Sequence, residues 1–289
     1  MIIWLASYPK SGNTWVRTFI SSIIFSKDGI SNFNNLEKIS QYPMRRHFYN
    51  LVENFQNINE IKKNWIISQE KMNLDNKIKF LKTHHVNCKI GTDNFTNHDN
   101  TKGVIYIVRD PRNVITSIKN HYNLDSLNIA KQFLFNEKNI ITMSEKQKEK
   151  YITKNEYPLP TVLGSWKTHY LSWKNMKKNY LLVKYENLIQ NPLEEFRKIS
   201  KYFSQILSLE FTNDQIEEAV KLSSFEKLKK MEENYGFTES SYNNITGEKN
   251  TFFNLGPKND WTKILNKDIA DEISSRFGPE MRELGYLSK

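Results

Sequence analysis

Short apolar runs alternate along the chain with longer amphipathic stretches. The apolar runs are residues 2–6, 79–82, 103–108 and 180–184. They show no alternation of apolar and polar positions, which is typical of parallel strands buried on both faces. The stretches between them carry apolar residues at helical spacing. We predict helices over residues 14–24, 111–122, 163–177 and 192–203.

This order of elements indicates an α/β fold with a central parallel sheet. Strands that alternate with helices form three-layer domains, in which helices cover both faces of the sheet. Ligands of such sheets bind beyond the carboxyl ends of the strands. We expect a single domain over residues 1–289. Segments 26–78 and 123–162 are less periodic and richer in Asn, and we expect them to cap the site.

The stretch Tyr8-Pro9-Lys10-Ser11-Gly12-Asn13-Thr14-Trp15 joins the first predicted strand to the first predicted helix. A tight loop there directs backbone N–H groups and the positive end of the helix dipole at an anion. Gly12 lets the backbone approach the ligand closely. Lys10 adds a mobile charge, and Ser11 and Thr14 add hydroxyl donors. A Walker loop has its Lys after the last Gly, whereas Lys10 precedes the Gly, so this loop is P-loop-like but of another class.

The composition fits a globular protein with an anionic ligand. The formal net charge is +10, from 42 basic and 32 acidic residues. The chain is crowded with Asn, Ile and Lys but has no long basic block, so a phosphate site and compositional drift explain the charge without a nucleic-acid partner. No apolar run approaches the roughly 20 residues of a membrane span. Because no signal-like segment precedes the first strand and Cys88 is the single cysteine, we expect a cytoplasmic protein.

The loop over residues 8–15 resembles the 5′-phosphosulfate loop of sulfotransferases that use 3′-phosphoadenosine 5′-phosphosulfate (PAPS). The resemblance is to the soluble, cytosolic type, and we expect a bacterial member. It implies that the loop binds the 5′-phosphosulfate end of PAPS. The residues that it assigns to this part of the nucleotide site are Lys10, Ser11, Gly12, Asn13, Thr14 and Trp15.

A second motif follows the third apolar run. Arg109 follows directly at the end of this run. Pro111 begins the next predicted helix, at a position where the N–H that proline lacks would have no intrahelical acceptor. Ser117 lies on that helix. The planar guanidinium of an Arg suits a phosphate. An Arg followed eight residues later by a Ser resembles the family's 3′-phosphate motif, which implies that Arg109 and Ser117 bind the 3′-phosphate of PAPS.

A third motif, Lys82-Thr83-His84-His85, lies at the end of the second apolar run. A His there can act as a general base, because its ordinary pKa of about 6.5 is near working pH. In the family, the His of Lys-Thr-His takes the proton from the acceptor hydroxyl. His84 occupies that place, and period-two alternation after the strand points His84 and His85 apart. We expect Lys82 to steady the sulfuryl oxygens and Lys10 to neutralise the oxygen that leaves.

Further matches extend the resemblance over nearly the whole chain. They are Gly164-Ser165-Trp166 with His169, Tyr185-Glu186-Asn187, and Ser223-Ser224-Phe225. The resemblance implies that Tyr185, Ser223 and Ser224 lie near the nucleotide. It also implies that Phe225 stacks on the adenine opposite Trp15.

One stretch departs from the family pattern of Arg-Lys-Gly, then Gly-Asp-Trp, in which Arg and Lys bind the 3′-phosphate. This chain reads Asn254-Leu255-Gly256 and then Asp260-Trp261, so Gly256 matches and both basic positions are lost. Losing charge-assisted contacts of this type costs a few kcal/mol of binding. Either Lys258 or Lys249 compensates from nearby, or the 3′-phosphate is held less tightly, or the donor differs. We assign Gly256 and Lys258 to the nucleotide site.

These motifs predict transfer of a sulfuryl group from PAPS to a hydroxyl acceptor, which gives a sulfate ester and 3′,5′-ADP without a metal. The acceptor is a small molecule or a glycan. Two alternatives stay open. An ATP-dependent P-loop-like kinase is disfavoured by the missing Walker order, and a non-catalytic nucleotide-binding module is disfavoured because both Lys10 and His84 are retained.

Overall fold

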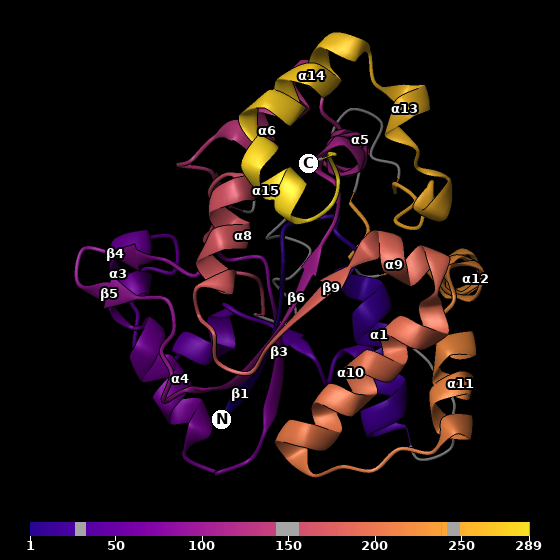
Figure 1. The fold of residues 1–289 in the computed structure, drawn as a ribbon. Helices are drawn as coiled ribbons and strands as arrows, with labels where there is room; N and C mark the ends of the chain where they lie inside the picture. The colour runs from indigo at the N-terminus through magenta and orange to yellow at the C-terminus, as the bar shows by residue number, and fades with distance from the viewer. Residues whose placement is uncertain (27–32, 143–155, 238, 242–248, 289) are drawn as a thin grey trace. The chain divides into compact units, whose positions relative to one another are not determined.

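The computed structural model describes residues 1–289 except 27–32, 143–155, 238, 242–248 and 289. The chain, drawn as a ribbon in Figure 1, divides into two compact units. Unit 1 comprises residues 1–8, 38–107 and 137–182, and unit 2 comprises residues 9–37, 108–136 and 183–289.

A sheet of five strands forms the centre of unit 1, and the final residues of two of its strands are counted with unit 2. Its order is β2 (Ser40–Gln41), β3 (Lys79–Thr83), β1 (Ile2–Ser7), β6 (Thr101–Val108) and β9 (Tyr180–Lys184). β1 pairs in parallel with β3 and with β6, and β2 pairs in parallel with β3. The predicted α/β class and central parallel sheet are therefore confirmed.

The other elements of unit 1 are short. They are η1 (Arg45–Phe48), α3 (Ile58–Lys63), α4 (Trp65–Asn73), β4 (Lys89–Ile90), β5 (Asp93–Asn94), β7 (Ile140–Ile141), β8 (Thr161–Val162) and α8 (Trp166–Lys174). α8 packs against β1, and α4 packs against η1 and β5.

Unit 2 is helical. Its elements are α1 (Asn13–Phe25), α2 (Phe33–Leu36), α5 (Pro111–His121), α6 (Leu127–Phe135), α9 (Tyr185–Gln190), α10 (Pro192–Leu207), α11 (Asn213–Leu222), α12 (Phe225–Tyr235), η3 (Gly256–Lys258), α13 (Trp261–Ile264), α14 (Lys267–Arg276) and α15 (Gly278–Glu283). α1 and α10 both pack against α11, while α5 packs against α6, α13 and α14 (Figure 1). No described helix is long and apolar enough to cross a membrane.

The four predicted strands and four predicted helices are all present; the strand over residues 180–184 has the predicted ends, and the others have shifted ends. The helix predicted from residue 163 begins at Trp166, because Gly164 has a positive φ of 66° and the Ser165 side chain caps the helix by accepting a hydrogen bond from the Thr168 N–H. The helix predicted over 192–203 runs on to Leu207. The short edge strand β2 was not predicted, because two residues are too few to show a period.

An aromatic cluster around Trp4 fills the core of unit 1. The Trp4 ring lies 5.4 Å from Tyr42, 5.6 Å from Phe95 and 5.9 Å from Trp173, measured between centroids. All four side chains are buried, and the Trp4 indole N–H donates to Thr101 Oγ1 at 3.1 Å. Burial of each ring contributes about 2 to 3 kcal/mol, so this cluster anchors the middle of the sheet.

Three histidines with lowered pKa values make the stability of unit 1 dependent on pH. Burial lowers the pKa of His47, His85 and His169 to about 3 in each case. The pKa of each His in the unfolded chain is near 6.5, so the unfolded state binds more protons below that pH. Their stabilisation is therefore complete above pH 6.5 and is lost as the pH falls towards 3.

We expect the His85→Phe variant to show a weaker pH dependence of unfolding. One buried neutral His contributes a slope of up to about 1.4 kcal/mol per pH unit below its unfolded pKa, and Phe removes that contribution. Phe can also keep the stacking of the ring on Phe95, at 4.1 Å and 6° in the native protein. Urea unfolding at pH 7.0, 6.0 and 5.0 measures the slope, and an unchanged slope in the variant would contradict the assignment.

Candidate functional site

The loop between β1 and α1 takes a conformation that requires Gly12. α1 begins at Asn13, and Gly12 is its N-cap residue with φ 97° and ψ 14°. A Cβ on this residue would lie 2.5 Å from Cδ2 of Tyr185. The preceding Lys10 also has a positive φ, 65°, which is uncommon for a residue with a side chain and is typical of strained functional loops. The loop is thus held tightly against α9.

Arg109 links this loop to α5. Its Nη1 donates to the Lys10 carbonyl at 3.1 Å and to Ser117 Oγ at 3.4 Å. The guanidinium lies over the Tyr185 ring, 4.1 Å from its centroid. Burial raises the pKa of Tyr185, and the Arg109 charge partly offsets this. Unit 2 therefore brings together Lys10, Gly12, Arg109, Ser117 and Tyr185, five of the predicted site residues.

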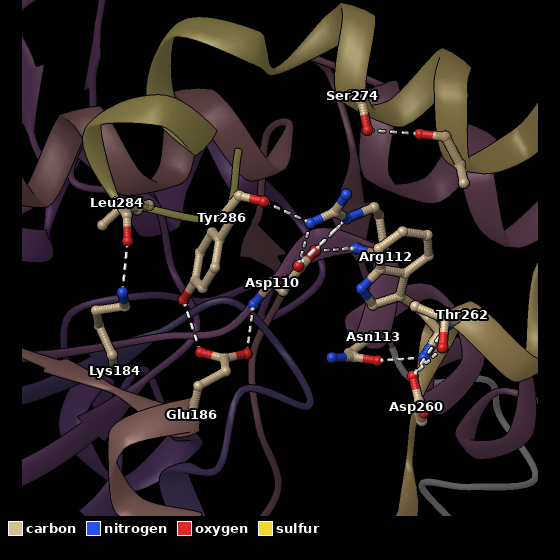
Figure 2. Close-up of polar contacts among 12 residues, drawn as sticks. Asp110, Arg112, Asn113, Lys184, Glu186, Asp260, Thr262, Ser274, Leu284 and Tyr286 are labelled. Carbon is tan, nitrogen blue, oxygen red and sulfur yellow. Dashed lines mark hydrogen bonds and ion pairs between the residues drawn. The ribbon is translucent and has the colours of Figure 1, made fainter. Parts of the chain in front are cut away.

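A polar network fixes the backbone that follows Arg109 (Figure 2). Asp110 forms an ion pair with Arg112 at 2.7 Å, and Arg112 also donates to the Tyr286 carbonyl at 2.7 Å. Glu186 accepts from the Asp110 N–H at 2.9 Å and from the Tyr286 hydroxyl at 2.8 Å. Burial raises the pKa of Glu186, while the bond from Asp110 lowers it in part. The network holds the start of α5, and with it the side chain of Arg109.

Ser11 is the residue of the loop that is best placed to bind an added anion. Its side chain is fully buried, and its Oγ has no hydrogen-bond partner among the described residues. A buried hydroxyl without a partner costs free energy, and a phosphate oxygen would satisfy it. Asn13 and Thr14 are also buried, at the first turn of α1 where helical N–H groups have no intrahelical acceptor.

Three partly buried aromatic side chains pack on an apolar cluster in unit 2. Trp15, Phe225 and Phe252 are partly buried and pack against a cluster of five buried residues, Leu36, Leu228, Met231, Phe237 and Phe253. Gly256 has a φ of 52°, and a Cβ there would overlap the Phe225 ring. Two flat rings, Trp15 and Phe225, are thus exposed in part on one cluster, as a site for a nucleobase requires.

Lys10 is positioned by an aromatic ring that the sequence did not indicate. Its Nζ lies 3.8 Å from the centroid of Phe252. The backbone N–H groups of Phe252 and Phe253 donate to the carboxylate of Glu232 at 2.8 and 2.9 Å, which fixes the Phe252 ring. Phe252 precedes the two substituted basic positions, and this proximity was the one signal that could have drawn attention to it.

The other residues predicted for the nucleotide site, Ser223, Ser224 and Lys258, lie at helix ends or on the surface. Ser223 Oγ donates to the Val220 carbonyl at 3.2 Å at the end of α11, and Ser224 Oγ caps α12 by accepting from the Lys227 N–H. Lys258 lies exposed on η3. Both serine hydroxyls thus serve helix ends, whereas Lys258 points to no described partner.

His84 lies in unit 1, just after β3 and half-buried. Its Nδ1 lies 2.7 Å from the Ser7 carbonyl and 3.3 Å from Ser7 Oγ. A carbonyl oxygen can only accept, so Nδ1 carries the proton and Nε2 is the basic nitrogen. The end of β1 therefore selects the tautomer that a general base needs.

Helix α8 holds the backbone of the same segment. His169 donates from Nε2 to the His84 carbonyl at 3.1 Å and accepts from the Tyr106 hydroxyl at Nδ1, at 2.8 Å. Trp173 Nε1 donates to the His85 carbonyl at 2.9 Å. The motif over residues 164–169 thus has a structural task, which is to position His84.

His85 is unsuited to the role of base. It is fully buried, its ring stacks on Phe95, and burial lowers its pKa to about 3. Lys82 lies in β3 two residues before His84 and is 5% exposed. Among the described ranges, no group of three His, Cys, Asp or Glu side chains could hold a metal ion.

Comparison with known proteins decides the family. A model of the sulfotransferase domain matches residues 2–285. The chain belongs to the sulfotransferase family. Its reaction class is therefore transfer of a sulfuryl group, as predicted, and the kinase alternative is not favoured.

Individual relatives of this sulfotransferase are distant. The 3-beta-hydroxysteroid sulfotransferase of Cavia porcellus is 28% identical over 189 residues, which cover 64% of this chain and 58% of that protein. Cytosolic sulfotransferase 16 of Arabidopsis thaliana is 23% identical over 300 residues, which cover 98% of this chain and 77% of that protein.

Solved structures share the fold. The crystal structure of mouse sulfotransferase SULT7A1 complexed with PAP matches with a TM-score of 0.58 at 18% identity, and covers 97% of this chain and 84% of that one. Retinol dehydratase in a complex with retinol and PAP matches with a TM-score of 0.54 at 17% identity, and covers 97% and 81%. Both neighbours carry PAP, a nucleotide with 3′- and 5′-phosphates.

We expect Gly12→Ala to destabilise this sulfotransferase by about 3 kcal/mol. A side chain at positive φ costs about 1 kcal/mol, and overlap of the new Cβ with Tyr185 adds about 2 kcal/mol. Gly285→Ala is the matched control, because Gly285 has a φ of 73° but a Cβ there would meet its nearest atom at 3.7 Å. Urea unfolding should show a loss of only about 1 kcal/mol in the control. Equal losses in both variants would show that the contact with Tyr185 carries no constraint.

Proposed function

We propose that this protein transfers the sulfuryl group of PAPS to a hydroxyl of a small-molecule acceptor. The observation that carries the proposal is the assembly of Arg109, Ser117 and the loop at residues 10–12 around Tyr185, beside the unpartnered hydroxyl of Ser11. It offers two anion-binding positions, one at the loop and one at the end of β6. PAPS has two such anionic ends, its 5′-phosphosulfate and its 3′-phosphate.

The residues of unit 2 fit the nucleotide. Ser11 and the N–H groups at the start of α1 would hold the 5′-phosphate. Arg109 and Ser117 would hold the 3′-phosphate by charge-assisted hydrogen bonds. Trp15 and Phe225 would flank the adenine, and the hydroxyls of Ser223 and Ser224 would contribute only after leaving the helix ends that they cap.

The chemistry needs one base and one cation. His84 Nε2 would take the proton of the acceptor hydroxyl as the acceptor oxygen bonds to sulfur. Lys10 would neutralise the phosphate oxygen that is released when its bond to sulfur breaks, and Lys82 would steady the sulfuryl oxygens. PAPS supplies the activated sulfuryl group, and 3′,5′-ADP is the second product. Positioning and charge account for most of the catalysis in such transfers.

The names of several relatives support a proposal for the acceptor class. Their names specify a hydroxysteroid in Cavia porcellus, a flavonol in Flaveria bidentis and a luciferin in Photinus pyralis. We propose a small hydroxyl compound for this chain, with a glycan hydroxyl as the second option. We also propose a single sulfotransferase domain over residues 1–289, supported by the family match over 2–285, and a cytoplasmic location, supported by relatives named as cytosolic.

Calorimetric titration with 3′,5′-ADP, 5′-ADP and ATP tests the donor site. We expect 3′,5′-ADP to bind at least 10-fold more tightly than 5′-ADP, because a phosphate that bonds to Arg109 and Ser117 contributes about 1.5 to 3 kcal/mol. Equal or tighter binding of ATP or 5′-ADP would show that the 3′-phosphate position does not operate, and the proposal would fail.

The variant His84→Ala tests the base. We expect its sulfuryl transfer to fall by about 10² to 10⁴-fold, with the affinity for 3′,5′-ADP within 2-fold of the native value. Turnover is measured with PAPS labelled on sulfur and a panel of a phenol, a steroid alcohol and a flavonol. His85→Phe is the matched control, since it changes the neighbouring His and should keep measurable turnover. Near-native turnover in His84→Ala would refute its role.

A further inference from the structure

Asn259 occupies a position where the family pattern carries glycine. The pattern has Gly directly before Asp-Trp, and this chain has Asn259 before Asp260 and Trp261. The backbone does not require glycine here, because φ is −74°. Asn259 is 6% exposed, so a buried amide follows directly after η3.

The amide of Asn259 makes three hydrogen bonds, all to α5. Nδ2 donates to the Asn113 carbonyl at 2.8 Å and to Ser117 Oγ at 3.1 Å, and Oδ1 accepts from Thr116 Oγ1 at 2.8 Å. The Asn113 carbonyl can only accept, which fixes the orientation of the amide. A further bond, from the Trp261 N–H to Asn113 Oδ1 at 2.8 Å, ties the same segment to α5 (Figure 2).

These bonds determine what the Ser117 hydroxyl can do. Ser117 Oγ accepts from Asn259 Nδ2 and, at 3.4 Å, from Arg109 Nη1. A hydroxyl has two acceptor lone pairs and one hydrogen to donate. With both lone pairs engaged, the hydrogen remains for a further acceptor, and Ser117 is half-buried, so a ligand can reach it. Asn259 and Arg109 therefore leave the hydrogen of the Ser117 hydroxyl available for donation to a ligand.

In the part of this stretch that the structure describes, neither Lys249 nor Lys258 contacts Arg109 or Ser117. Asn254, Leu255 and Lys258 are exposed. Nζ of Lys249 lies near the end of α12, 3.1 Å from the place of a Cβ on Gly236. The added amide is thus the one buried polar side chain that this stretch directs at the predicted phosphate residues within the described chain.

We propose that Asn259 is a positioning residue of the 3′-phosphate subsite. It orients the Ser117 hydroxyl as a donor to the 3′-phosphate. This oriented hydrogen bond compensates in part for the phosphate affinity that the Arg-Lys pair supplies in the family pattern. The inference rests on the proposed function, because it requires that a 3′-phosphate binds at Arg109 and Ser117.

A double-mutant cycle read by calorimetry tests this role. 3′,5′-ADP and 5′-ADP are titrated into the native protein, Asn259→Ala, Ser117→Ala and the double variant. We expect Asn259→Ala to weaken 3′,5′-ADP about 5- to 10-fold, the size of one oriented hydrogen bond, and to change 5′-ADP less than 2-fold. We expect the double variant to bind no more weakly than Ser117→Ala, because Asn259 acts through Ser117.

Two further variants separate orientation from folding. Asn266→Ala removes a side chain that caps α14 in the same unit by accepting from the Ile269 N–H, and it should lower stability without changing either affinity. Asn259→Asp keeps the shape and the bond from Thr116 but cannot donate to Ser117, so it should weaken 3′,5′-ADP more than 10-fold. If circular dichroism shows that Asn259→Ala does not fold, Asn259→Asp decides the question.

The outcomes distinguish this inference from the proposed function. If the native protein prefers 3′,5′-ADP but Asn259→Ala and Asn259→Asp keep that preference, Asn259 has no positioning role. Equal weakening of both nucleotides, or losses that add in the double variant, would also overturn it. If the native protein shows no preference, the 3′-phosphate subsite itself fails, and the inference fails with it.

Discussion

The left-handed conformation of Gly12 is the constraint on which the nucleotide half of the structure depends. It turns the chain into α1 and leaves a gap at Cα that the Tyr185 ring fills, since a Cβ would come within 2.5 Å of that ring. The Tyr185 ring also contacts Arg109, whose guanidinium lies 4.1 Å from the centre of the ring. A single aromatic side chain therefore relates the loop to Arg109, and a change at any of the three positions moves the other two.

The sequence alone predicted those elements and site residues whose positions depend on a local rule. The buried apolar runs have the length and pattern of parallel strands, and the loop at residues 8–15 and Arg109 follow two of them directly. Pro111 at the start of α5 sets Ser117 on that helix, so the Arg–Ser spacing translates into a contact. Residues joined by a strand end and one helix could thus be placed without knowledge of the tertiary structure.

Contacts between segments far apart in the sequence could not be predicted in this way. Asn259 and Ser117 are 142 positions apart, and the sequence presents the stretch only as a loss of two charges. Ser223 and Ser224 match the family motif, but in the described structure their hydroxyls serve helix ends, a use that depends on where α11 stops and α12 starts. Lys258 has the right charge but lies exposed. Charge and motif identify candidates, and the tertiary structure adds the burial and the hydrogen-bond partners of each.

The position of Lys10 shows how an aromatic ring can hold a cation beside a phosphate-binding loop. The face of an aromatic ring attracts a cation through the quadrupole of the ring and leaves the charge of the cation in place. Phe252 provides that face at 3.8 Å. The nearby carboxylate of Glu232 is engaged by the N–H groups of Phe252 and Phe253 and by the Ser240 hydroxyl, so it fixes the ring. The carboxylate of Glu232 thus acts on the backbone, and it holds in place the ring that attracts the ammonium group of Lys10.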